Sequence, residues 1–107
     1  MPRARACAIE TQPRTPPRAA EGRWTLAYAY LAQGKFFESD REFRKLLSLA
    51  SDREAAARAR WGMAQALEGM GQLGAAVEQY EAIRNEWEDP AYVAEKIDRL
   101  KNRMKAQ

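Results

Sequence analysis

Apolar side chains recur at spacings of three and four residues from Glu21 to the end of the chain. This period of about 3.6 residues places them on one face of a helix, and it predicts a series of amphipathic helices. Branched aliphatic residues are few and none lies in an alternating run, so composition also favours helix over strand. Five apolar stripes follow one another along the chain. The first consists of Trp24, Ala27, Tyr28 and Leu31, and the second of Phe36, Phe43, Leu46, Leu47 and Ala50. The third consists of Ala55, Ala59, Met63, Ala66, Leu67 and Met70, the fourth of Leu73, Ala76, Val77, Tyr80 and Ile83, and the fifth of Val93, Ile97, Leu100 and Met104.

Glycine, serine and aspartate at the ends of these stripes indicate where the helices begin and end. Gly34 and Gly71 each follow a stripe, and glycine readily adopts the left-handed conformation that ends a helix. Ser51 stands three residues before Glu54, which is the spacing of a capping box with serine as the N-cap. Aspartate followed by proline at residues 89–90 predicts the start of the last helix.

The sequence repeats itself after 37 residues. Large residues then coincide with large ones, small residues with small ones, and the two loop glycines with each other. The matched pairs are Trp24 with Trp61, Leu26 with Met63, Ala27 with Ala64, Tyr30 with Leu67, Gly34 with Gly71, Phe36 with Leu73, Phe43 with Tyr80 and Leu46 with Ile83. We therefore predict that one helical hairpin occurs twice.

These positions resemble the tetratricopeptide repeat family, whose unit of about 34 residues is a helical hairpin. The first unit is carried by Trp24, Leu26, Ala27, Tyr30, Gly34, Phe36 and Phe43, and the second by Trp61, Met63, Ala64, Leu67, Gly71, Leu73, Ala76, Tyr80 and Pro90. The resemblance spans residues 20–90. It implies an all-α fold, an α-α superhelix of two antiparallel helical hairpins followed by a C-terminal helix.

On this basis the chain divides into a leader and one helical domain. Residues 1–19 contain four of the five prolines and little to bury, so we predict a disordered leader. The helical domain comprises residues 20–107. Within it we predict the first hairpin at about 20–50, the second at about 52–88 and a capping helix at about 90–106, because repeat arrays end in an atypical element that covers the last unit.

The chain departs from the family pattern in three ways. Trp24 and Trp61 each stand one residue closer to the following Leu or Met position. Ser39 replaces the alanine at which the two helices of the first hairpin approach each other. The repeat is also a few residues longer than the family's unit, and we place the surplus around residues 49–54.

The displaced tryptophans affect the predicted binding surface. One residue turns a helical side chain by about 100°, which moves each indole from the hairpin core towards the concave side or the seam with the next helix. The resemblance implies that the first helices of the hairpins line a concave groove that holds an extended peptide or a partner's helix. Its residues would be Glu21, Trp24, Tyr28, Leu31, Arg58, Trp61, Gln65 and Glu68. Burial of both indoles between the hairpins is the alternative.

The formal net charge of +3 is unevenly distributed. Residues 1–19 hold four arginines and one glutamate, and residues 90–107 hold five basic and two acidic side chains. Basic ends of this kind bind nucleic acid or anionic membrane, and such an electrostatic binder is our second hypothesis. A solubilising tail and a solvated helix face explain the same charges, and only Tyr92 places an aromatic ring among them. We therefore expect neither nucleic acid nor a membrane as the partner.

The chain lacks the residues that most catalytic and metal sites need. It contains no histidine, the commonest general base and metal ligand. Cys7 is the only cysteine, so it has neither a disulfide partner nor a companion for zinc within these residues. Residues 69–74 match a dinucleotide-binding pattern in letters only, because they fall in a predicted helix–helix turn. Glu78 and Glu81 are one turn apart without calcium-loop spacing around them. We expect no catalytic residue, no metal site and no cofactor.

The expected function is that of a non-catalytic protein-protein interaction module, a scaffold or adaptor that holds a peptide or helix of a partner protein. A homo-oligomerisation domain is a third hypothesis, with a homodimer formed through the last helix or across the first hairpin. No apolar run approaches the roughly 20 residues of a membrane span, and the N-terminus lacks the apolar region of a signal peptide. The single cysteine fits a reducing compartment. We expect a cytoplasmic protein, with a periplasmic domain of a longer protein as the alternative.

Overall fold

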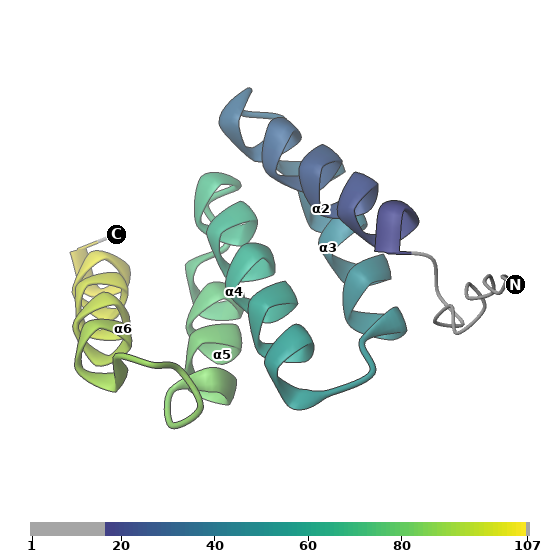
Figure 1. The fold of residues 1–107 in the computed structure, drawn as a ribbon. Helices are drawn as coiled ribbons and strands as arrows, with labels where there is room; N and C mark the ends of the chain where they lie inside the picture. Colours follow the sequence, from purple (N-terminus) through teal and green to yellow (C-terminus); the bar gives the residue numbers. More distant parts are fainter. Residues whose placement is uncertain (1–16, 107) are drawn as a thin grey trace, which may run out of the picture.

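The computed structural model describes residues 17–106, which form five α-helices and no strand (Figure 1). The helices are α2 (Pro17–Ala32), α3 (Phe36–Leu49), α4 (Arg53–Gly69), α5 (Leu73–Ile83) and α6 (Pro90–Ala106). For this described part of the chain, the prediction of an all-α fold with five helices is confirmed. Helix α2 begins at Pro17, so the predicted leader was too long by residues 17–19. Proline is well tolerated in the first turn of a helix, where its missing N–H has no partner to lose. The rest of the leader lies outside the described residues.

The loops after α2 and α4 have the same backbone conformation. Gly34 has a φ of 78° and Gly71 a φ of 80°, both in the left-handed region. The next residues, Lys35 and Gln72, have φ/ψ values of −88°/72° and −88°/73°. Each of these two residues donates its N–H to a carbonyl five positions back, at 2.9 Å in both loops. This hydrogen bond is typical of a helix that ends in a Schellman motif. The 37-residue sequence repeat is therefore also a structural repeat at its turns.

Aspartate side chains cap helices α4 and α6. Oδ1 of Asp52 accepts a hydrogen bond of 2.8 Å from the N–H of Ala55, which makes Asp52 the N-cap of α4. The predicted N-cap, Ser51, is therefore wrong by one residue. Both residue types cap helices well, and here the extended backbone continues for one position more. Oδ1 of Asp89 accepts from the N–H of Tyr92 at 3.2 Å, as predicted for the start of the last helix.

Each helix packs mainly against its neighbours in the chain. Helix α2 also lies alongside α4, so these two helices share one side of the molecule, while α3 and α5 share the other (Figure 1). Helix α6 packs on α5 at the end of the row. None of the described helices combines the length and the apolar character that crossing a membrane requires.

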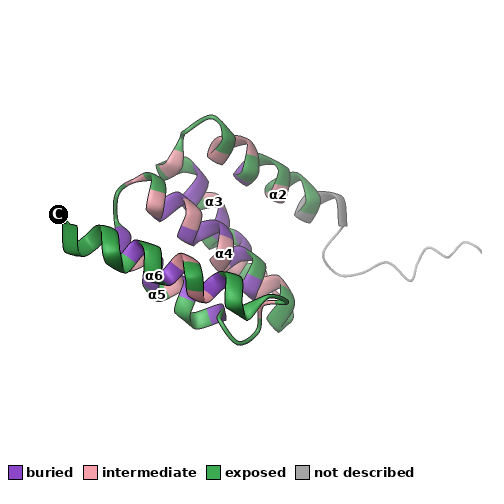
Figure 2. Cartoon of the chain, turned by 90° about the vertical axis from the view of Figure 1, so that its left-hand side faces the viewer, coloured by how far each residue is buried: buried purple, intermediate pink, exposed green. Residues whose placement is uncertain are grey.

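Buried side chains form two clusters, and they concentrate on α3 to α6, whereas most of α2 is exposed or half-buried (Figure 2). The first cluster joins both hairpins and consists of Ala27, Phe43, Leu46, Ala59 and Met63. The second joins α4, α5 and α6 and consists of Ala57, Ala64, Leu67, Leu73, Ala76, Val77, Tyr80, Ile83, Val93, Ile97 and Leu100. Met104, the last residue of the predicted α6 stripe, is 42% exposed.

Two glycines allow α3 to approach α4 closely. A Cβ atom on Gly62 would overlap the ring of Phe43, and a Cβ atom on Gly69 would overlap the ring of Phe36. Gly62 and Gly69 are seven residues apart on α4, and Phe36 and Phe43 are seven residues apart on α3. Two aromatic rings of α3 therefore occupy two consecutive openings on one face of α4. Nothing in the hydrophobic pattern indicated a role for these glycines.

Candidate partner-binding surface

Trp24 is the centre of an aromatic group on the side of the molecule that α2 and α4 share. Its ring stacks on Tyr28, with centroids 6.2 Å apart and planes at 23°. Phe43 of α3 contacts both rings, with centroids 6.1 Å from Trp24 and 5.2 Å from Tyr28. The guanidinium carbon of Arg58, on α4, lies 4.4 Å from the centroid of the Trp24 ring. This cation–π contact joins the two hairpins.

Trp61 belongs to a second aromatic group, formed by α4, α5, the loop after α5 and the start of α6. Trp87 stacks on it with 4.6 Å between centroids and 13° between planes. Tyr80 meets it edge-on at 5.2 Å, and Tyr92 lies at 5.8 Å. Trp61 and Trp24 are both half-buried. Each indole therefore contributes to packing and to the surface at the same time.

Glu68, near the end of α4, is held by two neighbours. Its Oε2 accepts a hydrogen bond from the hydroxyl of Tyr80 and lies 3.4 Å from Nζ of Lys96. Burial of the phenol, followed by the hydrogen bond to Glu68 and the charge of that carboxylate, raises the pKa of Tyr80 far above its ordinary value. The phenol therefore stays protonated at pH values at which an ordinary tyrosine side chain ionises. Through these contacts Glu68 links α4 to α5 and α6.

A hollow of about 760 Å³ opens between the first turns of α4 and the loop that joins α5 to α6. An ion pair connects its two walls, because Nη2 of Arg53 lies 2.8 Å from Oε2 of Glu86. The lining combines guanidinium groups, carboxylates and one indole. Its residues are Arg53, Glu54, Ala57, Arg58, Asn85, Glu86, Trp87 and Glu88.

Arg58 and Trp87 connect the hollow with the two aromatic groups. Arg58 covers Trp24 and also lines the hollow. Trp87 stacks on Trp61 and also lines the hollow. A single surface therefore runs from α2 across the start of α4 to the α5–α6 loop, and we call it the Arg58 surface. Its aromatic rings, guanidinium groups and carboxylates offer apolar contact and charge-assisted hydrogen bonds to a polypeptide.

The eight residues predicted to line a groove are not all brought together. Trp24, Tyr28 and Arg58 form one group of direct contacts. Trp61 and Glu68 take part instead in the packing towards α6. Exposure along the two helices also varies: Glu21, Tyr28 and Arg58 are exposed, whereas Trp24, Leu31, Trp61, Gln65 and Glu68 are half-buried.

The hollow and its loop residues were absent from the sequence-based prediction. A signal did exist for Trp87, which is a lone indole among acidic residues and stands four positions after Ile83, the end of the α5 stripe. The backbone N–H of Trp87 donates to the carbonyl of Ile83 at 3.0 Å, so the chain makes one more turn and directs the indole back towards α4. Arg53 and Glu86 gave no comparable signal, because they meet only through the course of the loop.

Several basic residues of α6 are paired with carboxylates. The pairs are Lys96 with Glu68 at 3.4 Å, Lys101 with Glu81 at 3.4 Å and Arg99 with Glu95 at 3.5 Å. They reduce the positive charge that the last helix offers to an anionic partner. The leader arginines at positions 3, 5 and 14 lie outside the described residues.

Within residues 17–106, no three acidic side chains lie close enough together to hold a metal ion. Comparison of the chain with protein-family models, curated proteins and solved structures finds no significant match. A function for this chain therefore has to rest on its own geometry.

Proposed function

We propose that this protein is a non-catalytic interaction module that binds an extended segment or a helix of a partner protein. The binding site is the Arg58 surface, from Trp24 and Tyr28 across Arg58 to the hollow beside Trp87. Two tetratricopeptide-like hairpins, α2–α3 and α4–α5, stack in a short superhelix with α6 as the closing helix, and this stack positions the site.

The repeated features of the two hairpins support this arrangement. The turn glycines Gly34 and Gly71 have φ values of 78° and 80°. Ser39 and Ala76, which occupy equivalent positions 37 residues apart, are both 0% exposed. Each helix packs on the next while α2 lies alongside α4, which is the order of contacts in a stack of antiparallel hairpins.

The position of Arg58 is the observation that carries the binding proposal. Its side chain is exposed, yet the guanidinium is held over Trp24 at 4.4 Å and at the edge of the hollow. A guanidinium that is already oriented loses little conformational freedom when it binds a carboxylate. The hollow has the volume of a typical ligand pocket, in the range of about 300–1,000 Å³.

The lining of the hollow indicates the chemistry of the bound segment. Arg53 is already paired with Glu86, whereas Arg58 and Glu54 form no ion pair among residues 21–106. Trp87 supplies an apolar wall between these charges. The site therefore suits a segment with an apolar side chain flanked by one acidic and one basic residue, which would face Arg58 and Glu54 respectively.

Peptides selected from a random phage-displayed library on the full chain test this proposal. Their dissociation constants are then measured by fluorescence anisotropy with the original chain and with Arg58→Glu. We expect Arg58→Glu to weaken binding at least about tenfold, because it reverses the charge at the edge of the hollow. The matched control is Arg103→Glu, which changes an exposed arginine of α6 outside the Arg58 surface and should leave the affinity within about twofold.

Trp61→Ala is a poorer test of binding, because Trp61 also packs against Tyr80, Trp87 and Tyr92. The circular dichroism spectrum and the unfolding midpoint of each variant establish that folding is intact. The proposal is wrong if the selected peptides bind Arg58→Glu as tightly as they bind the original chain, or if the selection enriches no peptide.

A further inference from the structure

The outward face of α2 is apolar, and no other described element covers it. Every residue from Trp24 to Ala32 except Thr25 is apolar or aromatic. Within this segment, however, Ala27 is the only buried residue. A helix that is apolar all round is normally surrounded by other elements. Helix α2 packs on α3 and α4 alone, so one side of it has no neighbour among the described residues (Figures 1 and 2).

Helix α4 shows what covers the equivalent face one repeat later. Ala59 and Met63 are buried against Phe43 and Leu46 of α3, and Gly62 contacts the ring of Phe43. The counterparts of Ala59, Gly62, Met63 and Ala66, 37 residues earlier, are Gly22, Thr25, Leu26 and Ala29. All four residues on α4 are buried and none of those on α2 is. Met63 is 2% exposed, whereas Leu26 is 41% exposed. The exposed face of α2 thus corresponds to the face of α4 that the preceding helix, α3, covers.

The openings on α2 are shallower than those on α4. Gly62 and Gly69 leave room for two aromatic rings of α3. Their counterparts on α2 are Thr25 and Ala32, and these side chains occupy part of that room. A helix that packs here in the same way therefore needs smaller, aliphatic side chains at two positions seven residues apart.

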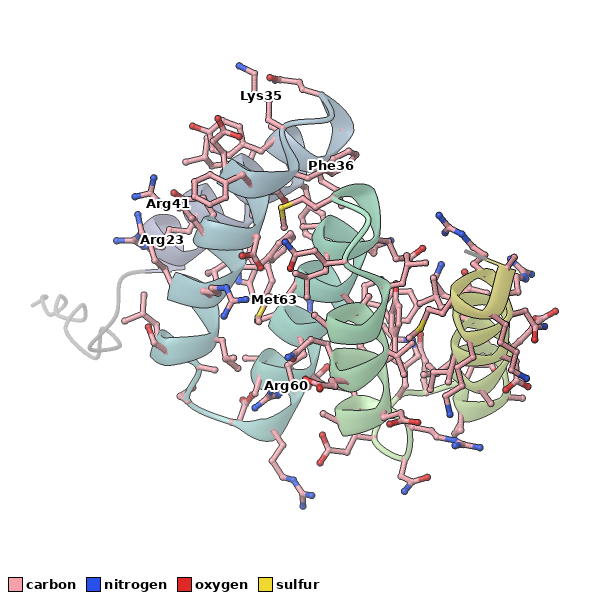
Figure 3. All side chains as sticks on the ribbon, turned by 180° about the vertical axis from the view of Figure 1, so that it is seen from behind. Arg23, Lys35, Phe36, Arg41, Arg60 and Met63 are labelled. Carbon is pink, nitrogen blue, oxygen red and sulfur yellow. The ribbon has the colours of Figure 1, made fainter. Side chains whose placement is uncertain are left out.

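Glu21, an exposed residue four positions before Thr25, places one carboxylate at the edge of this face, and Arg23 and Arg41 place two guanidinium groups beside it. Both arginines are exposed, and both point away from α4, α5 and α6 at the open end of the molecule (Figure 3). Arg23 is only loosely paired, because its Nη1 lies 4.0 Å from Oε1 of Glu42. Arg41 forms no ion pair among residues 21–106. Carboxylates beside the apolar positions of the docked helix would complement these two guanidinium groups.

We infer that the outward face of α2 docks a helix of another protein, one that carries aliphatic side chains seven residues apart with carboxylates beside them. In a second copy of the chain, the helices that could act in this way are α3 and α5, and their apolar faces already pack inside their own chain. The rings of α3 are inserted into α4, and Leu73 and Tyr80 of α5 are buried. The exposed side chains of α6 include Glu95, Asp98 and Arg99, which are charged. This face is separate from the Arg58 surface, so the two proposals can fail independently.

The test uses a peptide derived from α3, because the way α3 packs on α4 is seen in this molecule. The probe is a fluorescein-labelled peptide with the sequence of residues 35–50 and the changes Phe36→Leu and Phe43→Leu, titrated with the full chain. We expect saturable binding that Leu26→Glu weakens at least about tenfold, because this change places a charge in the apolar contact. Thr25→Arg, at an exposed position, should have a similar effect if Leu26→Glu perturbs folding.

Three comparisons define the specificity of this contact. Arg58→Glu, on the other surface, should leave the affinity of the probe within about twofold. Arg23→Glu should weaken binding about threefold by removing charge complementarity. The unmodified peptide, with both phenylalanines, should bind at least about fivefold more weakly than the probe.

Three results would overturn the inference. The first is the absence of saturation at about 1 mM chain, and the second is equal affinity of the probe for Leu26→Glu and the original chain. The third is self-association: sedimentation velocity without peptide should show a monomer, and a dimer that Leu26→Glu dissociates would assign this face to a second copy instead.

Discussion

The hydroxyl of Ser39 on α3 donates a hydrogen bond of 2.9 Å to the carbonyl oxygen of Ala27 on α2. Both residues are fully buried between the two helices of the first hairpin. The equivalent pair in the second hairpin, Ala76 and Ala64, is buried as well and has no hydroxyl. Either serine or alanine can therefore occupy this buried position between the two helices of a hairpin.

Ser39→Ala should consequently cost little. The carbonyl of Ala27 lies inside α2 and keeps its helical hydrogen bond, so no buried acceptor is left unpaired. We expect the free energy of unfolding, measured by urea denaturation, to fall by about 1 kcal/mol. A loss of about 3 kcal/mol or more would mean that the serine has a role that the second hairpin does not share.

Gly62→Ala should destabilise the protein although alanine is the better helix former. The added methyl group would overlap the ring of Phe43, which is 0% exposed and surrounded by packed side chains. Overpacking of this kind costs about 1–3 kcal/mol, more than the gain of up to about 1 kcal/mol in helix propensity. Urea denaturation measures the difference.

Gly22→Ala is the matched control for this change. Gly22 also lies inside a helix, but a Cβ atom there would have no atom within 4 Å. The substitution should therefore stabilise the protein by about 0.5–1 kcal/mol through helix propensity alone. If both alanine variants change stability in the same direction, the close contact between α3 and α4 does not explain the effect of Gly62→Ala.

The buried phenol of Tyr80 predicts a loss of stability at alkaline pH. Its pKa is raised in the folded protein, first by burial and then by Glu68, whereas in the unfolded chain it ionises near pH 10.0. The stabilisation is therefore complete below about pH 10 and decreases as the pH rises further, by about 1.4 kcal/mol per pH unit. Urea denaturation at pH 8, 10 and 11 follows this decrease.

Tyr80→Phe separates this effect from the titration of other groups. At pH 8 the variant should be less stable by about 1.5–3 kcal/mol, because the hydrogen bond to the Glu68 carboxylate is lost. Above pH 10 the gap between the two proteins should narrow, since phenylalanine cannot ionise. A gap of the same size at pH 8 and pH 11 would contradict the assignment to Tyr80.

Two residues that were predicted to face one groove should differ in their effect on stability. Trp61 contacts the rings of Trp87, Tyr80 and Tyr92, so Trp61→Ala should lower the free energy of unfolding by about 3 kcal/mol. Arg58 is exposed, and Arg58→Ala removes one cation–π contact worth about 1 kcal/mol or less. Equal losses in urea denaturation would argue against this division between packing and surface roles.

The features that could be predicted from the sequence are those that neighbouring residues determine. The period of apolar positions identified five helices, and Gly34 and Gly71 identified two of the turns because a left-handed residue is needed there. The predicted start of the first helix is too late, because proline disfavours the interior of a helix but is tolerated in its first turn. Pro17 instead opens α2.

The parts of the site that escaped prediction depend on residues distant in the chain. Arg53 and Glu86 form an ion pair across 33 positions, and their meeting follows from the path of the α5–α6 loop. Gly62 carries no side chain, so a pattern of side-chain hydrophobicity cannot assign it a contact. Trp61 and Glu68 lie on the predicted helix, but the neighbours that hold them come from α5, the loop after α5 and α6.

The three tryptophans of the chain provide the most direct measurement of the proposed function. All of them, Trp24, Trp61 and Trp87, belong to the two aromatic groups of the Arg58 surface, and their indole N–H groups give three signals in a ¹H–¹⁵N spectrum. On titration with a selected peptide we predict shifts of the Trp24 and Trp87 signals that saturate with the binding curve and are lost in Arg58→Glu. Saturated binding that leaves all three indole signals in place would contradict the proposal.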